Sequence, residues 1–155
     1  MISQTAEYAL RAMAWLALTP EQRVASASLA EHTKVPPDYL AKVLQLLGEA
    51  GFIDGRRGVR GGYQLAKSAR EIPLLDVINA VSRDESQIKR ITSCPLGLEN
   101  HGQNLCPLHQ AMDRAAEAVI GVLDGHTLAD LVSDDAAPKP LCDSKTTARL
   151  RIRGR

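Results

Sequence analysis

The sequence predicts a mainly helical protein with one small β-hairpin, and three observations lead to this fold class. The chain has 155 residues, 45% of them apolar but only 3% aromatic. Its core must therefore be aliphatic, a composition that favours helices over sheets. Apolar residues recur at helical spacing in several segments. Residues 52–65, in contrast, place short apolar arms around a tip rich in glycine and arginine, as a hairpin requires.

Three helices are expected before the hairpin. Residues 4–18 carry apolar side chains at helical spacing, and residues 26–33 form a shorter helix. A third helix begins at the two prolines of residues 36–37, because proline suits the first turn of a helix. A short helix, a tight turn and a longer helix are the outline of a helix-turn-helix.

The hairpin follows directly, and this position makes it a wing. Residues 1–83 are therefore predicted to form a winged helix-turn-helix. Its tip carries Arg56, Arg57 and Arg60 among glycines. Folding gains nothing from the mutual repulsion of three guanidinium groups, whereas glycines let the backbone approach a duplex and an arginine can enter the minor groove. This tip predicts contact with double-stranded DNA.

The third helix supplies a reading face opposite its leucines. Lys42 can reach a guanine edge or a phosphate, and Tyr39 can donate to a phosphate or pack on a thymine methyl group. The net charge of the chain is +1, but residues 34–70 hold seven basic and three acidic side chains. Each residue alone is equally well explained as solvated surface, so the prediction rests on the assembly. The predicted DNA-binding residues are Ser28, Asp38, Tyr39, Lys42, Arg56, Arg57, Arg60 and Gly61.

A long helix is expected over residues 107–124, after a shorter one over residues 74–82. The long helix has two apolar stripes. The first, spaced four, three, four, three as in a coiled coil, is Leu108, Met112, Ala115, Val119 and Val122. The second is Ala116, Ile120 and Leu123. One stripe can pack on its own domain while the other meets a second copy, so a homodimer is expected. The alternative is a helix buried on both sides within a monomer, which is difficult in so small a chain.

Two further segments complete the organisation. Residues 107–133 are assigned to the dimerisation helix and a short terminal helix. Residues 134–155 are polar, end in a run with five basic residues, and are expected to be a disordered basic tail. Residues 84–106 form a loop in which Cys94 and Cys106 bracket glycines and prolines, with His109 one helical turn further on. Thiolates and imidazoles gathered by a bent backbone are what a soft metal ion or an iron–sulfur cluster needs.

Several classes of protein are disfavoured. Charged residues interrupt the first apolar run, so no secretion signal is expected, and no stretch approaches a membrane-spanning length. A cytoplasmic protein is expected, where cysteines more often serve metals or redox sensing than disulfides. We find no activated nucleophile beside a base and no phosphate-cradling loop before a helix, so an enzyme is not expected.

These features resemble the IscR- and NsrR-type winged-helix transcription regulators, the Rrf-two family. The resemblance lies in residues 2–18, in Asp38-Tyr39-Leu40, in the wing sequence of residues 57–65 and in Cys-Pro-Leu-His at residues 106–109. It covers roughly residues 1–132. It implies that the long helix dimerises the protein and that the cysteine loop holds an iron–sulfur cluster whose state tunes operator binding, most simply in a repressor. The family also includes members without a cluster.

The resemblance implies three cysteine ligands, but this loop has two. The missing cysteine would fall near Asn100, beside His101. His109 stands where one relative uses a histidine ligand, and Glu7 matches a carboxylate that completes the site from the partner's first helix. The predicted ligands are Cys94, Cys106, His109, His101 and Glu7, and they suit a two-iron cluster with mixed ligands. Cys142 lies in the tail and is not assigned.

Other readings of the loop remain open. Its cysteines and histidines could bind zinc, the thiols could form a disulfide under oxidants, or the loop could simply pack. Glu7 could pair with Arg11 instead, and His109 could cap its own helix. A different class of protein, a small Cys/His metalloprotein that does not bind DNA, is the remaining alternative.

Overall fold

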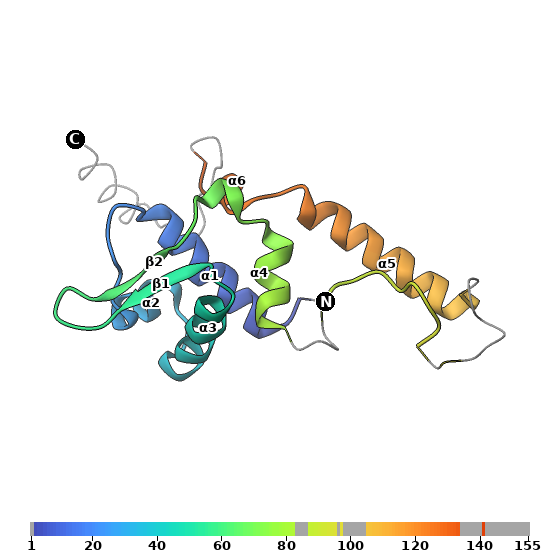
Figure 1. Cartoon of the computed structure of the whole chain (residues 1–155), viewed down its shortest axis with the longest axis horizontal. Helices are drawn as coiled ribbons and strands as arrows, with labels where there is room; N and C mark the ends of the chain where they lie inside the picture. The colour runs from blue at the N-terminus through green and yellow to red at the C-terminus, as the bar shows by residue number, and fades with distance from the viewer. Residues whose placement is uncertain (1, 83–86, 96, 98–104, 134–140, 142–155) are drawn as a thin grey trace.

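The computed structural model describes residues 2–82, 87–95, 97, 105–133 and 141, and within them the chain is mainly helical (Figure 1). The elements in order are α1 (Gln4–Leu18), α2 (Ser26–Thr33), α3 (Pro37–Glu49), β1 (Ile53–Arg56), β2 (Gly62–Leu65), η1 (Ala69–Glu71), α4 (Leu74–Val81), α5 (Pro107–Asp124) and α6 (Leu128–Val132). The predicted fold class is confirmed: a winged helix-turn-helix is followed by a long helix. The predicted tail, apart from Leu141, which packs against the core, and most of the loop between the cysteines lie outside the described residues.

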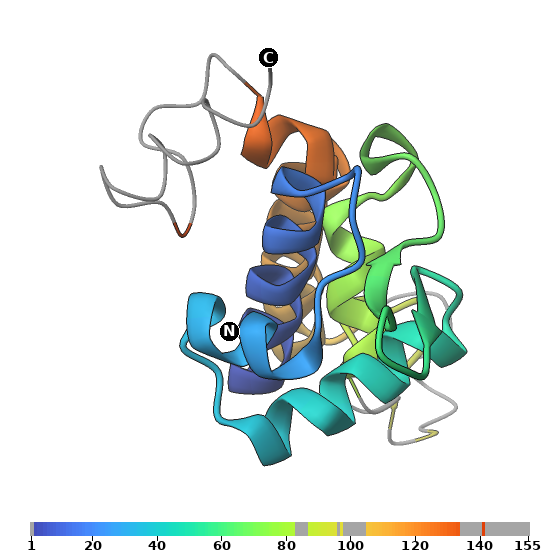
Figure 2. The same cartoon turned by 90° about the vertical axis from the view of Figure 1, so that its left-hand side faces the viewer.

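Helix α1 is the centre of the fold. A serine cap starts it, since Ser3 Oγ accepts a hydrogen bond from the backbone N–H of Ala6 at 3.2 Å. Helices α2, α3, α4 and α6 and strand β2 all pack against it (Figure 2). The sequence predicts apolar side chains at helical spacing on this helix, and the buried surface extends around several of its sides. The alanines of α1 allow neighbours to approach from several sides, and its buried residues are Ala6, Ala9, Ala12, Met13, Ala14, Trp15 and Leu16.

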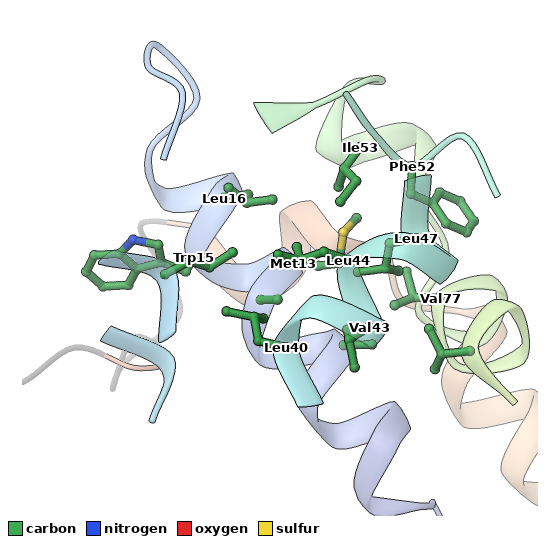
Figure 3. Packing of buried hydrophobic residues seen from close by; sticks show 14 of the residues in the cluster. Met13, Trp15, Leu16, Leu40, Val43, Leu44, Leu47, Phe52, Ile53 and Val77 are labelled. Carbon is green, nitrogen blue, oxygen red and sulfur yellow. The ribbon is translucent and has the colours of Figure 1, made fainter. Parts of the chain in front are cut away.

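Helices α2 and α3 form the helix-turn-helix. Lys34 ends α2 in the left-handed conformation, with φ of 56°, and so turns the chain sharply toward α3. The leucine-rich stripe predicted for α3 is buried, and Figure 3 shows it facing Met13 and Leu16 of α1. The stripe consists of Leu40, Val43, Leu44 and Leu47. This packing fixes α3 against the central helix and leaves its opposite face exposed.

The hairpin is joined to the helical body on two sides. Strands β1 and β2 pair antiparallel, with Ile53 opposite Leu65 and Arg56 opposite Gly62. Buried Phe52 and Ile53 anchor the first strand in the core. On the other side, Val24 exchanges backbone hydrogen bonds of 2.8 and 2.9 Å with Tyr63. The segment before α2 therefore acts as a short third strand, which the sequence did not predict.

Helix α5 extends away from this body (Figure 1). Its first predicted stripe is exposed, with Leu108 and Val122 each 64% accessible and Met112 51%. Its second stripe is half-buried, and Leu123 of that stripe packs against the core. Helix α5 thus presents an uncovered apolar face in the single chain. Within the described residues, no helix is long and apolar enough to cross a membrane.

Candidate nucleic-acid interface and metal-ligand loop

A groove separates the exposed face of α3 from the hairpin. It has a volume of about 590 Å³ and is also bounded by the start of α2. Figure 2 shows α3 ending beside the hairpin on this side of the molecule. The residues that line the groove are Ala25, Ser26, Ala41, Leu44, Gln45, Gly48, Glu49, Gly55, Arg56, Arg57, Gly58, Gly61, Gly62 and Tyr63. A helix face and an arginine-bearing loop therefore flank one opening, as contact with a duplex requires.

Three of the predicted DNA-binding residues lie in this groove: Arg56, Arg57 and Gly61. Gly61 is required by the tight tip, because a Cβ atom at this position would lie 2.2 Å from the carbonyl oxygen of Arg56. The three wing arginines are exposed, and no ion pair among the described residues includes Arg56, Arg57 or Arg60. Their charges are therefore available to an anionic partner.

The other predicted residues lie outside the lining of the groove. Asp38 and Lys42 are exposed on α3. Tyr39 is 58% accessible and meets Tyr8 of α1 edge-on, with ring centroids 6.1 Å apart. Ser28 is half-buried on α2, and its Oγ lies 3.4 Å from Nδ1 of His32.

The surface differs from the sequence analysis in two ways. Ala25 and Ser26 line the groove at the start of α2, and no local pattern marks them as part of it.

Arg70, in contrast, is one of the basic residues counted from the sequence between residues 34 and 70. It lies on η1, which packs on α6, and its charge acts on Asp130. Arg70 is therefore not part of the cationic groove.

Of the five predicted metal ligands, the structure brings two together. Cys106 precedes the first residue of α5, and its Sγ lies 3.4 Å from Nδ1 of His109. His109 is only 8% accessible, so the imidazole is held beside the thiol in a protected position. The spacing explains this contact, because residues three apart share one face of a helix turn. A thiol and an imidazole are suitable donors for iron or zinc.

Within the described residues, no further predicted ligand forms a metal-binding group with this pair. Cys94 is half-buried on the segment upstream of α5, and His101 lies outside the described residues. The Glu7 carboxylate pairs with the guanidinium of Arg11, as the alternative from the sequence proposed. Among the residues that the structure describes, no three His, Cys, Asp or Glu side chains form a group that could hold a metal ion.

An ion-pair cluster fastens the segment before Cys94 to α5. Arg90 Nε and Nη2 donate to the two carboxylate oxygens of Asp113 at 2.7 and 2.6 Å, and Nη1 donates to Glu117 at 2.6 Å. The backbone N–H of Ile91 donates to Asp113 at 2.8 Å. The hydrogen bonds from Arg90, and next that from Ile91, lower the pKa of Asp113 to about 2. No local sequence pattern indicates this clamp, because Arg90 and Asp113 are 23 residues apart.

Comparison with known proteins identifies the group to which this architecture belongs. Residues 2–134 match the Rrf2 family model, described as an iron-dependent transcriptional regulator. This chain belongs to the Rrf2 family. The resemblance predicted from the sequence is thereby confirmed, and the chain is a DNA-binding transcriptional regulator.

Individual relatives agree with this assignment. The chain is 36% identical over 141 residues to the HTH-type transcriptional regulator NsrR of Geobacillus kaustophilus, covering 87% of this chain and 91% of that protein. T. potens IscR superposes with a TM-score of 0.70 at 26% identity, covering 88% of each chain. CymR, the global cysteine regulator of B. subtilis, superposes with a TM-score of 0.68 at 28% identity. The match covers 88% of this chain and 98% of CymR. NsrR is a transcriptional regulator and CymR is a regulator, a class of protein distinct from enzymes.

The clamp on α5 predicts a pH dependence of stability. The pKa of Asp113 is lower in the folded chain than its ordinary value of 3.8, so its ionised form stabilises the fold above about pH 4. This contribution is lost as the pH falls toward 2, where the carboxylate takes up a proton. Asp113→Asn should therefore lower the free energy of unfolding at pH 7, and the difference from wild type should narrow between pH 4 and pH 2.

Denaturant titration at several pH values measures this difference. Asp124→Asn is the matched control, because Asp124 is an exposed carboxylate of the same helix with no ion pair among the described residues. A difference for Asp113→Asn that stays constant across this pH range would show that the clamp does not act through the carboxylate charge.

Proposed function

We propose that this chain is a homodimeric repressor whose affinity for its operator is set by an iron–sulfur cluster at the cysteine loop. The observation that carries the DNA-binding part is the groove in which the exposed side of α3 faces wing arginines that form no ion pair with another described residue. Both features stand on one side of the body, so a single duplex can meet them together. The protein would act in the cytoplasm, where the DNA is.

The two DNA-reading elements have different roles. The exposed face of α3 would enter the major groove, where Lys42 can donate to a guanine edge or a phosphate and Tyr39 can reach the backbone. The wing would lie along the neighbouring phosphates, with Arg60 at the minor groove. Gly61 keeps the wing tip narrow, since a side chain there would collide with the backbone of Arg56. Asp38 and Ser28 would supply polar contacts at the start of α3 and on α2.

Dimerisation is supported by the uncovered stripe of α5. Four of its five members, Leu108, Met112, Val119 and Val122, are exposed large hydrophobic residues of the single chain. Apolar side chains at this spacing pack well against a copy of themselves. We therefore assign residues 1–83 to the DNA-binding unit, residues 84–106 to the sensor loop, residues 107–133 to the dimerisation unit and residues 134–155 to a basic tail.

The cluster proposal rests on donor chemistry. Cys106 and His109 already form a protected thiol–imidazole pair. The other ligands would be Cys94 and His101 of the same chain together with Glu7 of the partner subunit. When bound, such a cluster offers a centre that responds to oxidants and small ligands. Glu7 is held by Arg11 in the single chain, so its release from that ion pair would be part of ligation.

A thiol switch without a cluster is the second candidate. It is supported by one observation: the Sγ of Cys106 lies 3.4 Å from Nδ1 of His109. An imidazole that hydrogen-bonds the thiol can accept its proton when the sulfur reacts. Zinc binding by the same residues is a further outcome that metal analysis would detect.

The wing contact predicts a salt-dependent loss of affinity. Arg60→Ala should weaken binding to any duplex roughly tenfold, and it should reduce the slope of log K against log salt by about 0.9, the share of one phosphate contact. Fluorescence anisotropy with a labelled promoter fragment over a range of salt concentrations measures both quantities. Arg70→Ala is the control, since Arg70 lies beside α6, and it should change neither. An unaltered affinity for Arg60→Ala would remove the wing from the interface.

A bound iron–sulfur cluster should make the purified protein coloured. Protein purified without oxygen should absorb visible light and contain iron and sulfide, and Cys106→Ala should abolish all three signals. Cys142→Ala should keep them, because Cys142 lies in the tail. Colourless wild-type protein that binds DNA and loses affinity on thiol oxidation would instead favour the thiol switch.

The exposed stripe predicts a dimer. Met112→Lys places a charge in the middle of the stripe and should raise the dimer dissociation constant by at least roughly tenfold. Analytical ultracentrifugation gives this constant. Gly121→Lys puts the same charge on the other side of α5, where a Cβ atom meets nothing within 4 Å, and it should leave the dimer intact. Equal behaviour of the two variants would argue against this stripe as the interface.

A further inference from the structure

Arg23 holds the two strands of the wing together from outside the hairpin. It lies in the segment between α1 and α2, and its side chain is only 14% accessible. Its Nη1 donates to the carbonyl oxygen of Asp54 on β1 at 3.0 Å and to that of Gly62 on β2 at 3.3 Å. Its Nη2 pairs with the carboxylate of Asp54. One guanidinium group therefore bridges both strands, with donors in a planar fork that a lysine cannot reproduce.

The attachment continues into the next residue. Val24 makes two backbone hydrogen bonds to Tyr63 of β2. A side chain at Gly62 is excluded by this close approach, because a Cβ atom there would lie 2.6 Å from the carbonyl oxygen of Val24. Residues 23–24 thus fix the strand pair near the wing tip, because Gly62 lies opposite Arg56 at the last pair before the loop. The start of α2, the face of α3 and the hairpin all line one groove, so this attachment joins the wing to the segment that leads into the helix-turn-helix.

Asp54 is an unexpected residue at this place. It is half-exposed, and its charge acts on Arg56, one of the wing arginines. The hydrogen bond from Arg23 lowers the pKa of Asp54, so the side chain stays ionised at neutral pH. A negative charge beside a DNA-binding surface opposes the approach of a polyanion. Electrostatics alone therefore predicts that removing this charge strengthens DNA binding.

We infer that Arg23 and Asp54 are positioning residues for DNA binding, which hold the wing at the distance from α3 that lets both contact one duplex. Arg23 does this from a shielded position and makes no contact with DNA itself. The inference rests on the proposed function in one respect: it assumes that the wing touches DNA.

The test uses the sign of the effect. Asp54→Asn should weaken duplex binding by roughly five- to tenfold, although it removes a negative charge, because the ion pair that orients the wing is lost and an amide oxygen accepts from Arg23 more weakly than a carboxylate does. Glu49→Gln is the matched control. Glu49 is an exposed carboxylate that lines the groove, and among the described residues it accepts a side-chain hydrogen bond from Gln45 of its own helix alone, at 2.8 Å. This substitution should raise affinity, because it removes a negative charge from the surface that a polyanion approaches. If Asp54→Asn also binds as tightly as wild type or tighter, Asp54 acts only as a charge and the inference is wrong.

Three further variants test the route of the effect. Arg23→Gln should weaken binding as Asp54→Asn does, and Arg23→Lys should recover only part of the loss. In the Arg60→Ala background, Asp54→Asn should cost much less than alone, since a wing that has lost its contact no longer needs to be positioned. Full additivity of the two losses would contradict an action through the wing.

A measurement without DNA separates the inference from the proposed function. In folded Asp54→Asn protein, verified by circular dichroism, the backbone amides of Val24 and Tyr63 should exchange with solvent faster than in wild type, while those of α1 keep their rates. Unchanged exchange at both amides would refute the attachment of the hairpin through Arg23 and Asp54, whatever the DNA result. If Arg60→Ala leaves DNA affinity intact but these amides exchange faster in Asp54→Asn protein, the wing does not contact DNA, and the attachment itself is confirmed.

Discussion

The attachment of the hairpin to the helical body is the constraint on which the functional surface depends. A two-stranded hairpin alone is only marginally stable in water. Here it gains a third pairing through Val24, a side-chain bridge from Arg23 and an apolar anchor in buried Phe52 and Ile53. These contacts place the wing arginines beside the exposed face of α3. Without them, the chain would carry a reading helix and a cationic loop with no fixed relation to each other.

The proposed sensor lies at the other end of the molecule. Figure 1 shows the hairpin and the start of α5 at opposite ends, so a signal at the start of α5 must reach the wing through other elements. The packing offers such a route: α5 contacts α4, α4 contacts α1 and α3, and α1 contacts α2, α3, α6 and β2. A change in how two α5 helices pack would therefore reach both reading heads through rigid helices. The Arg90 clamp ties the segment before Cys94 into this route.

Local sequence patterns predicted the elements well, and their failures have a common physical cause. The helix of residues 37–49, the glycine-rich wing and the two stripes of α5 follow from spacing along the chain, which is where those signals reside. Arg23 with Asp54, and Arg90 with Asp113, are 31 and 23 residues apart, and an arginine carries no mark of its distant partner. The metal site was the least predictable part. Its proposed ligands lie in a loop largely outside the described residues and on a second subunit, and in the single chain Glu7 prefers Arg11.

The most direct test of the central claim is amide hydrogen exchange of the full-length protein with and without a promoter duplex. If α3 and the wing form one DNA-binding surface, the duplex should slow exchange in residues 37–49 and in residues 53–65 together, and it should leave residues 69–71 of η1 unchanged. Protection of only one of the first two segments, or of a surface that contains neither, would contradict the account.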